Sequence, residues 1–180
     1  AEAGSLIFMA GGDDAVLARL QPLFQAMGKQ VFHMGETSKG QATKLVMNLQ
    51  IALIYEGFAE GLTLATKLGV DVEKLMPVIQ ASMIRSGVVD YKGPFILQRD
   101  FTPNFPLRLM HKDIRLTLEA AKEARVKLPA LETVEEIYRR VFHELKPRTA
   151  LWTDAWPGYW GRSWRGFPHA AIALGDNHER

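Results

Sequence analysis

Residues 38–69 read SKGQATKLVMNLQIALIYEGFAEGLTLATKLG, and no proline interrupts them. Ser38 and Gln41 have the spacing of a capping box at the start of a helix, and Gly69 is placed to end it. At about 1.5 Å per residue, this helix would be roughly 45 Å long. Its apolar residues occupy most of its circumference, which indicates burial on several sides. The run therefore predicts one long, central helix.

The residues before this run predict one strand, one helix and a second strand. Residues 5–10, SLIFMA, form a short apolar segment typical of a buried strand. Asp13 or Asp14 can cap a helix that ends at Gly28, and residues 30–35 predict the second strand. A single unit of this kind cannot cover both faces of a sheet. We expect the missing partners to come from another chain or from outside these 180 residues.

Helical signals continue from residue 70 to about residue 146. Asp71 is expected to cap a helix whose inward side chains are Leu75, Met76, Val78 and Ile79. The glycines and prolines of residues 84–106 favour loops with short helical pieces.

Two further helices are expected after that segment. One starts at Asn104 or Pro106 and runs to about Ala124, and the last follows Pro129 and runs to Leu145. The predicted fold is therefore mainly α, an all-helical bundle around one long helix, preceded by a strand–helix–strand remnant. The predicted division is 1–35, 36–146 and an atypical tail, 147–180.

Composition excludes several classes of protein. The 22 basic and 20 acidic residues leave a net charge of +2, which gives no support to a nucleic-acid or membrane-surface role. The absence of cysteine excludes disulfides, thiolate metal sites and a cysteine nucleophile. No apolar stretch reaches the roughly 18 residues of a membrane span. We therefore expect a cytoplasmic protein.

The tail contains all four tryptophans, at residues 152, 156, 160 and 164. Pro157, Gly158 and Gly161 fall between them and argue against a continuous helix. Such a segment is consistent with an aromatic, arginine-bearing binding surface or with an extension that has no native role. We assign it no function.

The first candidate site lies in SKGQATKLVMN, residues 38–48. Gly40, Lys44 and Asn48 share one face of the predicted helix. Gly40 has no side chain, so a ligand or another backbone could approach there. Lys44 could exchange a proton with a bound oxygen, and Asn48 could hold the same molecule by its amide. On spacing alone, an ordinary surface lysine is the better interpretation.

A second candidate site lies in FPLRLMHKDIRL, residues 105–116. Lys112 could bind a phosphate or carboxylate, and Asp113 could orient a neighbouring base. An exposed helix face with an ordinary ion pair is the alternative. His111 is a possible base, but the five histidines show no metal-ligand spacing, so we predict no metal site. The sequence contains no G-x-S-x-G, P-loop or G-x-G-x-x-G motif.

Together these segments resemble the β-hydroxyacid dehydrogenase family, over residues 1 to about 145. Residues 1–12, AEAGSLIFMAGG, resemble the segment that closes the family's Rossmann domain. Residues 38–48 resemble its catalytic G-x-G-x-x-x-K-x-x-x-N motif, and residues 110–116, MHKDIRL, resemble its downstream K-D-L segment. The order and spacing of three matches make this resemblance more specific than any one of them.

The resemblance implies a role for each candidate residue. Lys44 would be the catalytic acid and base, Asn48 would bind substrate, and Lys112 would contact the cofactor, NAD or NADP. Phe105 and Asp113 would line or support the substrate pocket. The chain departs from the family pattern at Ser38, which replaces the first motif glycine, and in lacking the G-x-G-x-x-G turn that binds a dinucleotide.

The function implied is interconversion of a small hydroxyacid and its semialdehyde or keto acid. By this reading the chain is incomplete and inactive alone, and it forms a homodimer or homotetramer through its helical part. The alternative is a non-catalytic oligomerisation module of the same fold, although such a module needs neither Lys44 nor the Lys112–Asp113 pair. An imine reductase shares the architecture, but that branch replaces the lysine.

Overall fold

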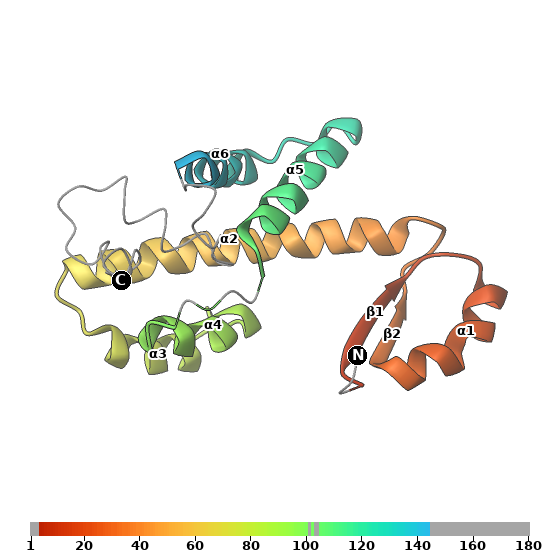
Figure 1. The fold of residues 1–180 in the computed structure, drawn as a ribbon, viewed down its shortest axis with the longest axis horizontal. Helices are drawn as coiled ribbons and strands as arrows, with labels where there is room; N and C mark the ends of the chain where they lie inside the picture. The colour runs from red at the N-terminus through yellow and green to blue at the C-terminus, as the bar shows by residue number, and fades with distance from the viewer. Residues whose placement is uncertain (1–3, 101, 103–104, 145–180) are drawn as a thin grey trace, which may run out of the picture. The chain divides into compact units, whose positions relative to one another are not determined.

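The computed structural model describes residues 4–100, 102 and 105–144. The elements of this part of the chain are β1 (Leu6–Ala10), α1 (Asp14–Met27), β2 (Gly28–His33), α2 (Lys39–Lys67), α3 (Val72–Ala81), α4 (Gly87–Leu97), α5 (Leu107–Glu123) and α6 (Pro129–Glu144) (Figure 1). The predicted mainly-α fold with a strand–helix–strand start is confirmed. Among the described helices, none is long and apolar enough to cross a membrane. The predicted tail lies outside the described residues.

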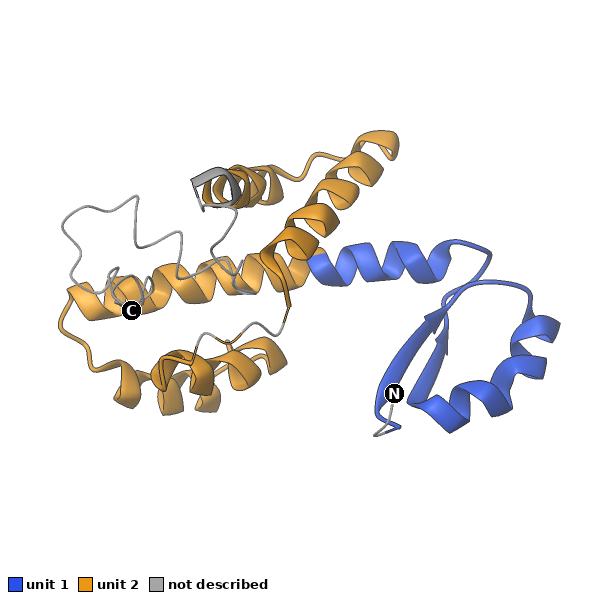
Figure 2. Ribbon diagram, in the orientation of Figure 1, with its two compact units in different colours: residues 1–48 blue, residues 49–180 orange. Residues whose placement is uncertain are grey.

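The chain divides into two compact units, residues 1–48 and 49–180, with the boundary inside α2 (Figure 2). In unit 1, β1 and β2 pair in parallel and α1 connects them. Asp13 caps α1 as predicted, because its carboxylate accepts hydrogen bonds from the amides of Ala15 (2.9 Å) and Val16 (3.2 Å). Phe24 of α1 packs on Phe8 of β1, with ring centroids 5.0 Å apart.

Two predictions for unit 1 were wrong. β1 is not a buried strand, because Leu6 and Ile7 are 41% and 56% exposed. A sheet of two strands with one covering helix has too little surface around it to enclose either strand. β2 begins at Gly28 rather than residue 30, since the same glycine ends α1 and already has extended backbone, with φ −143°.

α2 has the length that its sequence predicts, and Gly69 ends it. Gly69 has a left-handed backbone, φ +74°. The amide of Val70 donates to the carbonyl of Ala65 (2.8 Å) and that of Gly69 to Thr66 (3.1 Å), the two bonds of a Schellman motif.

The predicted serine cap at the start of α2 is wrong. Ser38 has φ +77°, a left-handed backbone, whereas a capping residue needs an extended one. The physical reason is the turn before the helix, in which the amide of Lys39 donates to the carbonyl of Glu36 (3.1 Å). Closing that turn places Ser38 in a conformation that favours glycine.

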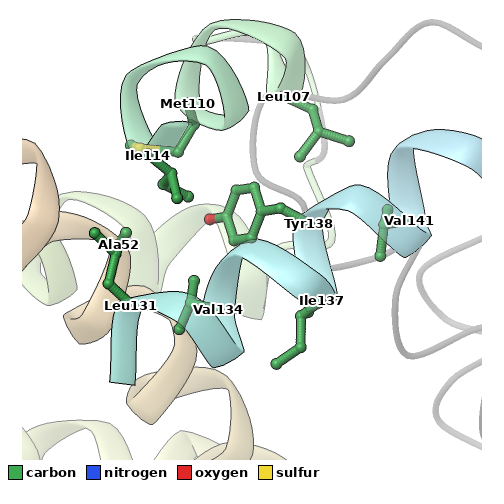
Figure 3. Close-up of a cluster of buried hydrophobic side chains, with 9 residues drawn as sticks. All are labelled: Ala52, Leu107, Met110, Ile114, Leu131, Val134, Ile137, Tyr138 and Val141. Carbon is green, nitrogen blue, oxygen red and sulfur yellow. The ribbon is translucent and has the colours of Figure 1, made fainter. Parts of the chain in front are cut away.

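The described part of unit 2 contains two buried apolar clusters, and α2 contributes to both. The first joins α2, α5 and α6 around Tyr138 and consists of Ala52, Leu107, Met110, Ile114, Leu131, Val134, Ile137, Tyr138 and Val141 (Figure 3). The second joins α2, α3 and α4 and consists of Phe58, Leu62, Met76, Ile79 and Val89. The predicted burial of the long helix on more than one side is therefore confirmed within this unit.

One prediction for unit 2 was also wrong. Val78 is 61% exposed, not inward, because Met76 and Ile79 already fill the buried side of α3. Among its described residues, the segment expected to be loop-rich with short helical pieces contains one helix, α4, of 11 residues. Its Gly93, which the sequence suggests as a helix breaker, is buried where Met76 packs, and a side chain there would require the end of the methionine side chain to move.

Candidate functional site

The first turn of α2 lies directly against the end of β1. A Cβ atom added to Gly40 would collide with the carbonyl oxygen of Met9. A Cβ added to Gly11 would lie 2.5 Å from the carbonyl oxygen of Glu36 and 2.9 Å from the amide nitrogen of Gly40. Real Cβ atoms do not make such contacts, so only glycine fits at these two positions. The sequence left open whether a ligand or another backbone approaches Gly40, and the structure shows a backbone.

Lys44 and Asn48 follow Gly40 at successive turns of the same helix face, as the sequence predicts. Lys44 is exposed and Asn48 is half-buried. Side chains on a helix lean toward its N-terminus, so Lys44 leans toward the turn that packs on β1. An exposed ammonium group and an amide one turn apart can hold one small polar molecule between them.

His33 joins the loops that follow β1 and β2, a feature that sequence reasoning missed. Its Nε2 atom lies 2.9 Å from the carbonyl oxygens of both Gly12 and Gly35, and its Nδ1 atom lies 2.8 Å from Oδ1 of Asp14. Both partners of Nε2 are acceptors only, so this nitrogen carries a proton. From the sequence, His33 is only one residue of a predicted strand. Its partners lie up to 21 residues away.

The residues of the second candidate site lie in unit 2. Nζ of Lys112 is 2.5 Å from Oδ1 of Asp113, and the two side chains are 53% and 5% exposed. The buried carboxylate therefore holds a lysine that still reaches solvent. Phe105 lies just before α5 and is 37% exposed. His111 contacts Oε1 of Glu135 at 2.9 Å and so connects α5 to α6.

Glu56 is a second feature that sequence reasoning missed. Its Oε1 atom is shielded from solvent and meets no hydrogen-bond partner among the described residues. Desolvation, with a smaller contribution from the charge of Glu60, raises the pKa of Glu56 to about 7. The signal in the sequence was a lone carboxylate in the apolar run IALIYEGFA, residues 51–59.

The structure brings the candidate residues together in two pairs. Lys44 and Asn48 belong to unit 1, and Lys112 and Asp113 form an ion pair in unit 2, where Phe105 also lies. Within the described ranges, no group of three or more histidines and acidic residues could hold a metal ion.

The turn between β1 and α1 does not fit the pyrophosphate of a dinucleotide. In a Rossmann fold that group sits on the free amides at a helix N-terminus. Here the carboxylate of Asp13 already occupies those amides, and Asp14 adds a second negative charge in the first turn. An anion at this position would be repelled.

Comparisons with known proteins match two segments of the chain. The sequence model described as "NAD-binding of NADP-dependent 3-hydroxyisobutyrate dehydrogenase" matches residues 38–150, which is more than half of the chain. The chain belongs to the β-hydroxyacid dehydrogenase family. The model described as "NAD binding domain of 6-phosphogluconate dehydrogenase" matches residues 1–35. The predicted family is therefore confirmed, and NAD(P) is the cofactor class of this family.

Several relatives of this β-hydroxyacid dehydrogenase family member are close in sequence. The chain is 38% identical over 139 residues to 2-(hydroxymethyl)glutarate dehydrogenase of Eubacterium barkeri, a match that covers 77% of the chain and 46% of the relative. It is 33% identical over 138 residues to 2-hydroxy-3-oxopropionate reductase of Escherichia coli K12, covering 77% and 47%.

A solved structure shares the fold. Mycobacterium tuberculosis 3-hydroxyisobutyrate dehydrogenase, solved with L-serine, superposes with a TM-score of 0.77 at 27% identity. The match covers 87% of this chain and 55% of the other. The chain thus spans about half the length of the relatives that it matches.

Proposed function

We propose that this chain is the substrate-binding and catalytic part of an NAD(P)-dependent dehydrogenase that interconverts a small hydroxyacid and its semialdehyde or keto acid. The observation that carries the proposal is the placement of exposed Lys44 and half-buried Asn48 on one helix face, one and two turns after Gly40 contacts β1. Ligands of α/β proteins bind outside the carboxyl ends of parallel strands. Met9, which contacts Gly40, lies at that end of β1.

In the proposed reaction Lys44 moves the proton. During reduction its ammonium donates a proton to the carbonyl oxygen of the substrate, and during oxidation its amine accepts the hydroxyl proton. Hydride transfer is the chemistry that a nicotinamide supplies when it is bound. The Asn48 amide, one helical turn from Lys44, binds and orients the same substrate.

In the proposal, the ion pair of unit 2 also has a role. Asp113 is almost fully buried and holds Nζ of Lys112, which leaves that partly exposed lysine pre-oriented to contact cofactor and substrate. Phe105 lines the substrate pocket. His111 has a structural role, because Glu135 engages it between α5 and α6.

We propose that the pyrophosphate of the cofactor is held by residues outside these 180. The sequence has no G-x-G-x-x-G, and the turn before α1 does not accept an anion. Residues 1–35 would then complete a dinucleotide-binding domain, and residues 36–146 would form a helical substrate-binding and dimerisation domain.

The test is an assay of the chain joined to its upstream dinucleotide-binding segment. Semialdehyde or keto-acid reduction is followed by nicotinamide absorbance, with a panel of small substrates. We expect Lys44→Ala to lower kcat on the order of 10²- to 10⁴-fold, because the proton donor is lost. Asn48→Ala should mainly raise KM, since it removes a substrate contact.

The matched control is Lys67→Ala, which removes an exposed lysine from the other end of the same helix. Its turnover should equal that of the parent. Equal rates for the parent and Lys44→Ala would contradict the proposed role of Lys44, and no turnover in either protein would favour the non-catalytic oligomerisation module. The 180-residue chain alone should show no turnover.

A further inference from the structure

The contact between Gly40 and β1 holds the helix turn that precedes Lys44. The atom that faces Gly40 is the carbonyl oxygen of Met9, which is backbone and cannot rotate away as a side chain could. In an α-helix the amide of residue i+4 donates to the carbonyl of residue i, so Gly40 and Lys44 are directly linked. Any displacement of the first turn therefore moves Lys44 with it.

The surface against which this turn packs is itself fixed. The amide of Met34 donates to the carbonyl of Ala10 (2.8 Å), and that of Gly12 donates to Gly35 (2.9 Å). His33 adds contacts of 2.9 Å to the carbonyls of both Gly12 and Gly35. These bonds tie the loop after β1 to the loop before α2. An added methyl group would therefore displace the helix rather than the loops.

We propose that Gly40, together with Gly11, is a positioning residue. The close approach that the two glycines allow sets the distance of Lys44 from the end of β1 and its orientation about the axis of α2. This inference rests on the proposed function. It gives a reason for glycine at residue 40 that does not involve ligand contact, because the space that a side chain would occupy belongs to the backbone of Met9. Gly11 meets the same contact from the strand side.

Gly40→Ala in the joined, active protein tests the proposal. We expect kcat to fall on the order of 10²-fold with KM changed less than about threefold, because a misplacement of about 1 Å has an effect of this size on chemistry. Gly57→Ala is the matched control, since a Cβ on Gly57 meets nothing within 4 Å in the same helix. It should leave kcat unchanged.

A double-mutant cycle separates positioning from general damage to the fold. If Gly40 acts through Lys44, then Gly40→Ala should cause little further loss of kcat in a Lys44→Ala background. A loss that adds in full to that of Lys44→Ala would overturn the inference, as would unchanged turnover in Gly40→Ala. If Gly40→Ala does not fold, Gly11→Ala is put through the same cycle with the same criteria.

The two proposals fail in different ways. Equal activity of the parent and Lys44→Ala defeats the proposed function, whatever Gly40→Ala does. Loss of activity in Lys44→Ala, with normal kcat in a folded Gly40→Ala protein, keeps the proposed function and defeats the positioning role.

Discussion

Glu56 shows how much a single buried oxygen changes the chemistry of a residue. Its side chain lies on α2 in unit 2, with Oε1 shielded from water, and desolvation and the nearby charge of Glu60 raise its pKa to about 7. The folded protein therefore keeps this proton over a pH range in which the unfolded chain has released it. Ionisation of the Glu56 carboxyl therefore lowers the stability of the folded protein.

The free energy of unfolding should fall between about pH 4.5 and pH 7 because of this group. The folded-state pKa is raised, so the folded state binds more protons in that window, and stability is lost as pH rises through it. The shift corresponds to at most about 3 kcal/mol, and partial solvent contact reduces this to about 2 kcal/mol.

Glu56→Gln should therefore stabilise the protein by about 2 kcal/mol at pH 8 and by nearly nothing at pH 4. Urea unfolding at both pH values measures the difference. Glu60→Gln, which removes only the neighbouring charge, should give a smaller gain. An equal effect of Glu56→Gln at both pH values would show that its carboxylate is not desolvated.

At the scale of elements, a backbone turn, and not a side-chain cap, precedes the first residue of α2. Its flanking residue Ser38 has a left-handed backbone, and the family motif has glycine at that position. The next motif glycine, Gly40, is required by the close approach of Met9. Ser38 and Gly40, which precede Lys44, thus adopt conformations set by the path of the backbone.

Ser38→Gly should stabilise the protein by about 0.5 kcal/mol, because relief of the left-handed strain exceeds the entropy that glycine adds to the unfolded chain. Thermal and urea unfolding measure this gain. Ser38→Ala is the discriminating control: it should be nearly neutral if Ser38 does not cap α2. A loss of about 1 kcal/mol in Ser38→Ala would instead indicate a working serine cap.

At the scale of the whole molecule, the two units are stabilised by different means. Among the described residues, both large apolar clusters lie in unit 2, whereas unit 1 combines a two-stranded sheet, one covering helix and the polar contacts of His33. The exposed strand residues Leu6 and Ile7 indicate that unit 1 buries little of its own sheet. Stability of the chain should therefore depend mainly on unit 2.

Ile114→Ala should lower the free energy of unfolding by about 2–5 kcal/mol. Ile114 is a residue of α5 that is 1% exposed and packs in the cluster with α2 and α6, so its truncation leaves a cavity. Leu64→Ala is the control on α2, because Leu64 is 60% exposed and should cost less than about 1 kcal/mol. Urea unfolding followed by helical circular dichroism measures both. Similar losses in the two variants would contradict the packing described for unit 2.

Local signals explain which parts of the fold and site the sequence could predict. Asp13, one of two candidates for its helix, and Asp71 accept the amide hydrogen bonds expected of caps, because a cap depends on residues two or three positions away. The run without proline and the terminating Gly69 determined the extent of α2 in the same way. The shared face of Lys44 and Asn48 follows from helical spacing alone, and the roles of both residues stay predictions.

The sequence by itself determined the order of the elements, the long helix and the spacing of its polar residues, because these depend on neighbours along the chain. Only the tertiary structure decided what approaches Gly40, what His33 binds and why Glu56 holds its proton. It also decided that Val78 is exposed and where α4 begins and ends. Each of these depends on groups distant in the sequence, and burial and close contact exist only after the chain has brought such groups together.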